Sequence, residues 1–228
     1  MEFDQFAASY SEDVERVVAF SGRGHDFFLA AKVAHLLALA RARCGAPRDL
    51  TALDVGCGTG VLTGMLAPHL RRLYGTDIAA LALREGARHA PSCGFVRYDG
   101  TLLPYRDGAF DFAYSVCVLH HVPVAARAGL LREMRRVVRP GGMVAFFEHN
   151  PWNPLTRYVV SRCCFDRDAV LLRCAELRGL LRQAGLREVD HAYILPFPWR
   201  SGFWRSAEAG LRRLPVGTQY WVAGRQSG

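Results

Sequence analysis

Short apolar runs alternate with amphipathic segments of helical length between residues 50 and 148, and this alternation is the strongest constraint on the fold. Strands separated by helices of 10–15 residues form a parallel sheet with right-handed crossovers. In such sheets, ligands bind at the carboxyl ends of the strands. We predict strands at 50–55, 72–78, 95–98, 110–116 and 143–148, with helices at 60–70, 80–89 and 124–138.

The segments on either side extend this pattern. Apolar residues at helical spacing predict a helix over 26–43 and another over 170–184, and the runs 186–195 and 219–223 are typical of strands. The whole chain therefore predicts one α/β domain with a Rossmann-like, doubly wound sheet of seven strands. We expect this sheet to be mostly parallel with an antiparallel last strand, with N-terminal helices and a small insert after the fifth strand, over 150–167.

Targeting and redox signals indicate the compartment. Residues 1–4 lack the basic-then-apolar pattern of a signal peptide, and no apolar run approaches the ~20 residues of a membrane helix. The seven cysteines are scattered without C-x-x-C spacing, so we expect reduced thiols and no metal. These features predict a soluble cytoplasmic protein.

The charge balance bears on partners. The formal net charge is +8, and Lys32 is the single lysine, so the cations are almost all arginines. Arginine binds phosphate bidentately, which leaves an anionic partner such as a phospholipid headgroup open. The arginines are spread over many predicted helices and are not interleaved with aromatic residues, which argues against nucleic acid.

A glycine-rich loop joins the first predicted strand to the next helix. Residues 54–60 read D-V-G-C-G-T-G. Glycines let the backbone approach a ligand closely, and the helix N-terminus attracts a carboxylate or phosphate. Dinucleotide-binding loops read G-x-G-x-x-G/A, but the position of their third glycine is occupied here by Val61.

This loop resembles motif I of the class I S-adenosylmethionine-dependent methyltransferases. The resemblance continues in order through the segments 74–78, 98–100, 103–111, 115–122 and 138–142. It implies S-adenosylmethionine as cofactor, with Asp77 binding the ribose hydroxyls, Asp99 meeting the adenine amine, and Asp54 with the loop amides holding the methionine portion. The cofactor-binding residues that it implies are Asp54, Gly56, Cys57, Gly58, Gly60, Asp77, Ile78, Asp99, Gly100, Thr101 and Ser115.

The chemistry of the cofactor agrees with these residues. S-adenosylmethionine has no phosphate, and the loop has no P-loop lysine. A carboxylate such as Asp77 can accept hydrogen bonds from two hydroxyls. Asp77 and Asp99 have a second interpretation, because they can be helix caps or turn residues. Cys57 can likewise be a structural thiol. The resemblance divides the single domain 1–228 into an N-terminal helical lid (1–48), a cofactor-binding core (50–148) and an acceptor-side insert with C-terminal strands (149–228).

Candidate catalytic groups follow the fourth and fifth strands. An oxygen or carbon acceptor usually needs a proton removed, for which histidine is suited. His149 follows strand five on the expected acceptor side, and His121 belongs to the His120–His121 pair after strand four. Tyr10 resembles a lid tyrosine that closes over the cofactor. Packing roles remain open for all three: the histidine pair can hydrogen-bond its loop, and Tyr10 can be a core aromatic.

The predicted reaction is methyl transfer to a small-molecule acceptor, through an oxygen, nitrogen or carbon atom. A glycan, a lipid-linked compound and a secondary metabolite all remain open, as do a protein or RNA acceptor and the oligomeric state. The aromatic and arginine-rich segment 197–205 can line a pocket, cover the sheet or contact a membrane surface. The alternatives are a nicotinamide-dependent oxidoreductase, against which Val61 and the absence of a Tyr-x-x-x-Lys pair argue, and a non-catalytic cofactor-binding module.

Overall fold

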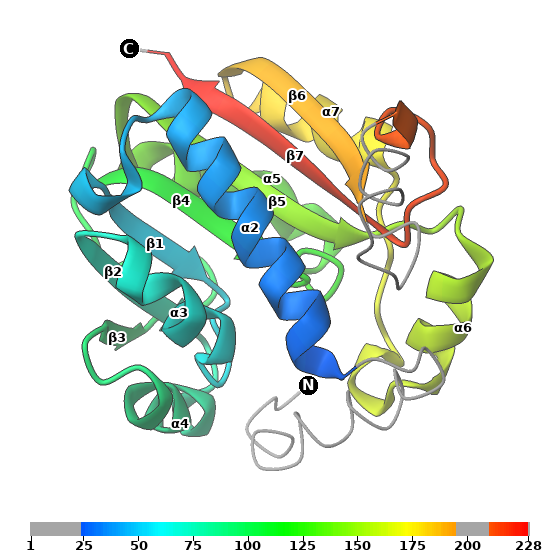
Figure 1. Ribbon diagram of the computed structural model, residues 1–228, viewed down its shortest axis with the longest axis horizontal. Coiled ribbons are helices and arrows are strands. Elements are labelled where there is room, and N and C mark those ends of the chain that lie inside the picture. The colour runs from blue at the N-terminus through cyan, green and yellow to red at the C-terminus, as the bar shows by residue number, and fades with distance from the viewer. Residues whose placement is uncertain (1–23, 195–209, 228) are drawn as a thin grey trace.

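The computed structural model describes residues 24–194 and 210–227, and its centre is a seven-stranded sheet (Figure 1). The strand order is β3-β2-β1-β4-β5-β7-β6. Every strand that the sequence predicts is present, so the predicted fold class is confirmed. The strands are β1 (Thr51–Val55), β2 (Arg72–Asp77), β3 (Gly94–Arg97), β4 (Phe110–Val116), β5 (Val138–His149), β6 (Leu186–Ile194) and β7 (Gln219–Gln226).

The direction of the strands places the functional edge of the sheet. β1 pairs in parallel with both β2 and β4, so the strand order reverses between β1 and β4. β7 lies between β5 and β6 and is antiparallel to both, as the sequence predicts for the last strand. Ligands of open α/β sheets bind where the order reverses, at the carboxyl ends of the strands.

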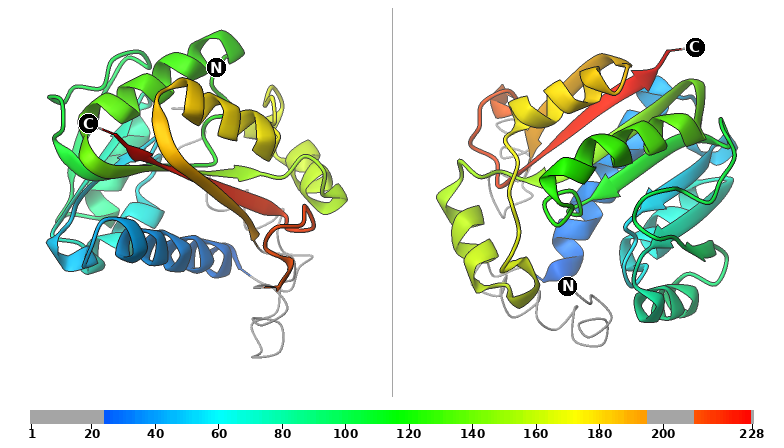
Figure 2. Two further views of the ribbon diagram at one scale, coloured as in Figure 1. Left: turned by 90° about the horizontal axis from the view of Figure 1, so that it is seen from above. Right: turned by 180° about the vertical axis from the view of Figure 1, so that it is seen from behind.

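Helices cover both faces of the sheet (Figure 2). On one face, α2 and α3 pack over a core that contains Leu36, Leu66 and Tyr114. On the other face, α5 and α7 pack over a core that contains Leu131, Leu177 and Phe146. Each helix contributes an apolar stripe to the core. The α-helices are α2 (His25–Arg43), α3 (Val61–Leu66), α4 (Ala80–His89), α5 (Val124–Val137), α6 (Pro154–Arg162) and α7 (Cys174–Gln183).

Some boundaries differ from the sequence-based expectation. β5 begins at Val138 rather than at residue 143, because Val138 already pairs with Phe110 before a register shift. α7 begins at Cys174 rather than at residue 170. The insert contains α6, and the Asn153 side chain caps its N-terminus by accepting hydrogen bonds from the backbone N–H groups of Leu155 and Thr156. This cap and Pro154 in the first turn are a helix-start signal.

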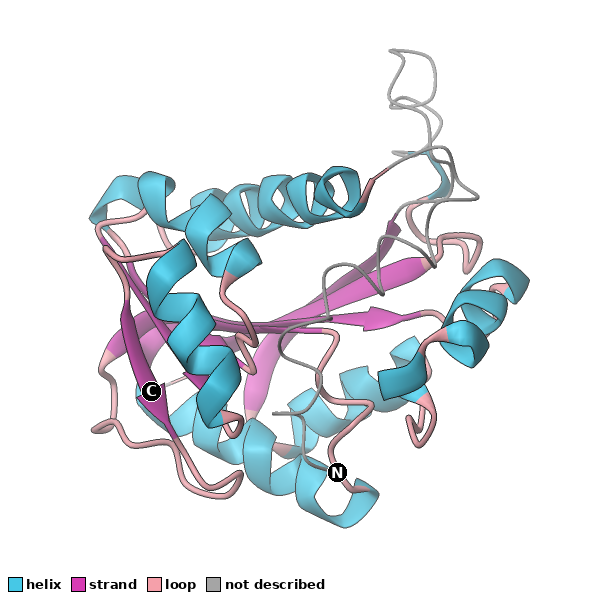
Figure 3. Cartoon of the chain, turned by 90° about the horizontal axis from the view of Figure 1, so that it is seen from below, coloured by secondary structure: helices cyan, strands magenta, loops and turns pink. Residues whose placement is uncertain are grey.

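Figure 3 shows the strands (magenta) between two layers of helices (cyan). Among the described residues, no helix is long and apolar enough to cross a membrane. Tyr10 and the segment 197–205 lie outside the described residues, so their predicted roles remain predictions.

Candidate active site

The glycine-rich loop after β1 turns in a backbone conformation that only glycine adopts readily. Gly56 and Gly60 have φ angles of 77° and 70°. A Cβ atom on Gly56 would lie 2.5 Å from Cγ2 of Val118, and one on Gly60 would lie 2.7 Å from the Cα atom of Gly86. The loop is therefore packed closely against the residues that follow β4 and against α4.

Asp77 fastens this loop to the end of β2. Its Oδ2 accepts a 2.9 Å hydrogen bond from the N–H of Gly58, and its Oδ1 accepts one of 2.9 Å from the N–H of Ala79. A Cβ atom on Gly58 would meet nothing within 4 Å. A carboxylate, a left-handed glycine and open space beside that glycine thus lie together, which is a surface that a ligand can approach.

Asp99 lies in the loop after β3. Its Oδ1 accepts hydrogen bonds from the N–H groups of Thr101 and Leu102 and from the Thr101 hydroxyl, and these bonds lower the pKa of Asp99 to about 2. A Cβ atom on Gly100 would lie 3.6 Å from Cγ2 of Ile78. Gly100 therefore lies beside Ile78, the residue after Asp77. The hydrogen bonds of Asp99 to Thr101 and Leu102 form a turn, the second interpretation of Asp99, and cofactor binding by these residues stays a prediction.

Three of the predicted cofactor residues are more enclosed. Asp54 is buried, its Oδ2 accepts a 2.8 Å hydrogen bond from the Thr63 hydroxyl, and burial raises its pKa to about 7. Burial also raises the pKa of the Cys57 thiol. The buried Ser115 hydroxyl donates a 2.8 Å hydrogen bond to the carbonyl of Val55. These contacts hold the base of the loop, and direct cofactor binding by these side chains stays a prediction.

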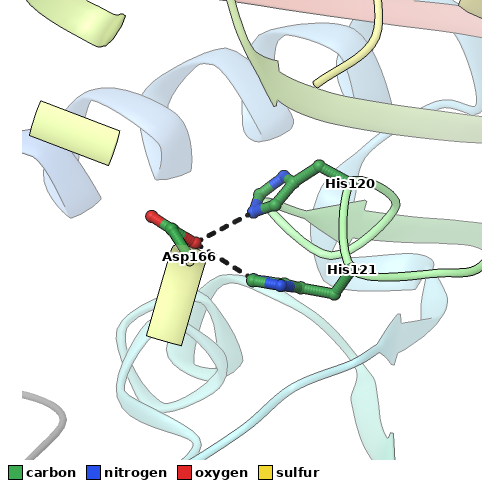
Figure 4. A group of neighbouring side chains, drawn as sticks. All are labelled: His120, His121 and Asp166. Carbon is green, nitrogen blue, oxygen red and sulfur yellow. Dashed lines mark ion pairs between the residues drawn. The ribbon is translucent and has the colours of Figure 1, made fainter. Parts of the chain in front are cut away.

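A cluster of His120, His121, Glu148 and Asp166 lies where β4 and β5 end, and Figure 4 shows all of these residues except Glu148. Nδ1 of His120 lies 2.5 Å from Oε2 of Glu148, whose Oε1 accepts hydrogen bonds from the N–H groups of Val118 and Leu119. Nε2 of His120 and Nε2 of His121 lie 3.4 Å and 3.2 Å from Oδ1 of Asp166.

The charges within this cluster support one another. Burial alone would lower the pKa of His120, but Glu148 and Asp166 outweigh burial and raise it to about 10. Conversely, burial would raise the pKa of Glu148, and the His120 cation lowers it. His120 and Glu148 therefore form a buried ion pair.

His149 lies at the end of β5 beside this cluster. Its ring centroid is 5.1 Å from that of His120, and its Nδ1 is 3.5 Å from Nε2 of Gln219. Burial, followed by the His120 cation, lowers the pKa of His149 to about 4, so the imidazole is neutral near pH 7. The structure thus places His121 and His149, two of the predicted catalytic residues, at one edge of the sheet.

Sequence reasoning missed three other polar residues of this edge, which are Lys32, Gln219 and Asp166. Nζ of the buried Lys32 and Nε2 of Gln219 each lie 3.6 Å from Sγ of Cys117. Cys117 has a φ of 57°, which is rare for a residue other than glycine. These three residues come from distant elements: Lys32 from α2, Gln219 from β7 and Asp166 from the insert. No short motif therefore connects them to the loop after β4.

A cavity of about 510 Å³ lies beside the insert. Asp166 lines it together with the guanidinium-bearing residues Arg157, Arg162 and Arg167. The cavity therefore shares one residue with the histidine cluster and is bordered by positive charge.

Known proteins match both the sequence and the fold. Residues 53–146 match the model of a methyltransferase domain. An uncharacterized methyltransferase from Mycobacterium sp. (strain JLS) is 35% identical over 197 residues, 77% of each chain. A demethylmenaquinone methyltransferase from Beutenbergia cavernae is 39% identical over 112 residues, 48% of this chain and 46% of its own, so the chain matches just under half the length of that relative.

Among solved structures, an S-adenosylmethionine-dependent methyltransferase from Thermotoga maritima has the same fold. Its TM-score is 0.72 at 17% identity, with 99% of this chain and 98% of that chain covered. The fold and the site define the class of protein: an α/β domain with a glycine-rich loop at the carboxyl end of its first strand. The chain belongs to the S-adenosylmethionine-dependent methyltransferases of class I.

S-adenosylmethionine is the cofactor of this family, and the residues present fit it. The nucleoside part of the cofactor needs acceptors for two hydroxyl groups, and a carboxylate such as that of Asp77 can accept hydrogen bonds from both. The open face of Gly58 leaves room for a ligand against the main chain.

Proposed function

We propose that this protein transfers a methyl group from S-adenosylmethionine to a small-molecule acceptor. The observation that carries the proposal is the position of Val118. Its side chain would meet a Cβ atom on Gly56 of the cofactor loop, and its N–H donates to Glu148 of the buried cluster. One short segment thus joins the cofactor loop to the cluster of histidines and carboxylates.

The cofactor loop and the cluster would have separate functions. The loop, Asp77 and Asp99 would bind the cofactor, which supplies an activated methyl group when bound. His149 would receive a proton from the acceptor, or orient it, because it lies at the strand end beside the cluster. Alignment of acceptor, methyl group and sulfur would then supply much of the rate acceleration.

The acceptor side favours a small molecule with an acidic group. The cavity beside the insert has the volume of a small-ligand site, and Arg157, Arg162 and Arg167 can pair with an anion. Since one relative is a demethylmenaquinone methyltransferase, demethylmenaquinone is one of the acceptors to test. The seven cysteines are scattered without C-x-x-C spacing, which supports the cytoplasm as the compartment.

Calorimetric titration tests the proposal. The purified protein is titrated in parallel with S-adenosylmethionine, S-adenosylhomocysteine and NAD. We expect the first two to bind and NAD to give no heat. Binding of NAD alone, or no binding by any of the three, would contradict the proposal. Formation of S-adenosylhomocysteine then reports turnover in a screen of acceptors with and without an acidic group.

A further inference from the structure

We infer that His120, His121 and Asp166 form a binding site for a divalent transition-metal ion such as Zn²⁺. These residues bring two imidazole nitrogens and one carboxylate oxygen within 4.8 Å of one another. Two histidines and a carboxylate are a ligand set that transition metals use, with remaining positions left for water or substrate.

Two of the three separations between the proposed ligand atoms fit a shared metal, and all three lie within 4.8 Å. Charge-assisted hydrogen bonds are about 2.7–2.9 Å long. The separations between Asp166 Oδ1 and the two Nε2 atoms are 3.4 Å and 3.2 Å. Ligand bonds of about 2.1 Å place neighbouring ligand atoms about 3.0–3.4 Å apart in octahedral and tetrahedral sites.

The surroundings of His120 supply a second, independent observation. A metal-binding histidine almost always donates its other ring N–H to a carboxylate, a carbonyl or water, which fixes the tautomer. Nδ1 of His120 contacts Glu148, and two backbone N–H groups hold that carboxylate in place. This arrangement leaves Nε2 of His120 directed at Asp166, as Figure 4 shows.

Charge and burial also favour a metal cation, which would replace the proton on Nε2 of His120. The side chains of Glu148 and Asp166 are 1% and 5% exposed, so two carboxylates are enclosed in one small volume. Because Asp166 also lines the cavity of the insert, a metal here would lie beside the proposed acceptor site. There it would take an oxygen atom of the acceptor as a further ligand, a role that rests on the proposed function.

Metal titration tests the site directly. The protein is treated with EDTA, dialysed, and titrated with ZnCl₂ by calorimetry and with CoCl₂ by visible absorption. We expect one equivalent to bind, with a Co²⁺ spectrum of nitrogen and oxygen ligands. Asp166→Asn should weaken metal binding more than 10-fold. The control is Asp168→Asn, which changes an exposed aspartate two residues away. This control should bind the metal as the unaltered protein does. Glu148→Gln should weaken binding by about 10–100-fold.

Other outcomes would overturn the site. They are the absence of binding to the unaltered protein, equal binding to both aspartate variants, or a thiolate spectrum that assigns the metal to cysteines. His121→Gln replaces Asp166→Asn if that variant does not fold by circular dichroism. Titration of the same samples with S-adenosylmethionine separates the two proposals, because loss of metal binding with intact cofactor binding refutes only the metal site.

Discussion

The N–H of Gly58 donates a 2.9 Å hydrogen bond to Oδ2 of Asp77, so the cofactor loop after β1 is fastened to the end of β2. This carboxylate shapes the loop through Gly58 and Ala79, and in our proposal it also binds the ribose of the cofactor. The two roles can be separated experimentally.

Asp77→Asn should weaken binding of S-adenosylmethionine by about 10–100-fold, because hydrogen bonds to a charged group contribute about 1.5–3 kcal/mol. The amide has only one accepting oxygen, so its NH2 group would face the N–H of Gly58 or of Ala79, and we expect the thermal unfolding temperature to fall, but less than in Asp77→Ala. Asp77→Ala should lose both binding and loop order. Calorimetry measures the affinity, and Asp49→Asn on the exposed surface is the control. Unchanged affinity in both Asp77 variants would exclude the ribose role.

Asp54 should make stability depend on pH. Its pKa is raised to about 7 in the folded protein from an ordinary value of 3.8, so the folded state holds a proton that the unfolded state releases. Its favourable contribution is complete below about pH 4 and is lost as the pH rises through about 7. The loss is on the order of 4 kcal/mol.

Urea unfolding of the protein without ligand, between about pH 4 and 8, measures this effect. Asp54→Asn cannot ionise, so its free energy of unfolding should rise relative to that of the unaltered protein as the pH increases. All other titrating groups are common to both proteins and cancel in the difference. A difference that is constant with pH would show that Asp54 has no raised pKa.

His149→Gln should keep affinity for S-adenosylmethionine and lower turnover about 10²–10⁴-fold if His149 accepts the acceptor's proton. Calorimetry measures cofactor binding, and formation of S-adenosylhomocysteine measures turnover once an acceptor is found. His69→Gln replaces an exposed histidine and serves as the control. Equal turnover in the two variants would rule out His149 as the base.

Gly60→Ala should destabilise the fold. Alanine at a φ of 70° is strained by about 1–2 kcal/mol, and its Cβ atom would lie 2.7 Å from the Cα atom of Gly86. We expect the free energy of unfolding to fall by about 2 kcal/mol or more. Gly179→Ala is the matched control, because a Cβ there meets nothing within 4 Å inside α7 and should stabilise by about 0.5–1 kcal/mol. A smaller loss in Gly60→Ala would mean that α3 and α4 can move apart.

The sequence predicted those parts of the molecule that depend on local patterns. β1 is buried at every position, and three of its five residues are apolar. The glycines of the loop follow it at fixed spacing. The residues gathered around the cofactor loop were predicted because they belong to segments with their own motifs. The antiparallel direction of β7 was also predicted, although no motif covers that strand.

The acceptor side could not be predicted in the same detail. Asp166 lies 45 residues beyond His121 in an insert without a motif, and Lys32 reaches Cys117 from 85 residues away. Such contacts arise only when the sheet and α2 assemble. The helix α6 was missed although Asn153 and Pro154 are a recognisable start signal.

The position of β7 has a consequence for synthesis of the chain. β6 pairs only with β7 among the described strands, and β7 also covers the edge of β5. While a ribosome is still making residues 219–226, β5 and β6 therefore expose unpaired strand edges, which favour aggregation. A nascent chain stalled before residue 219 should need a chaperone. Addition of the eight residues of β7 then pairs β5 and β6 through this strand.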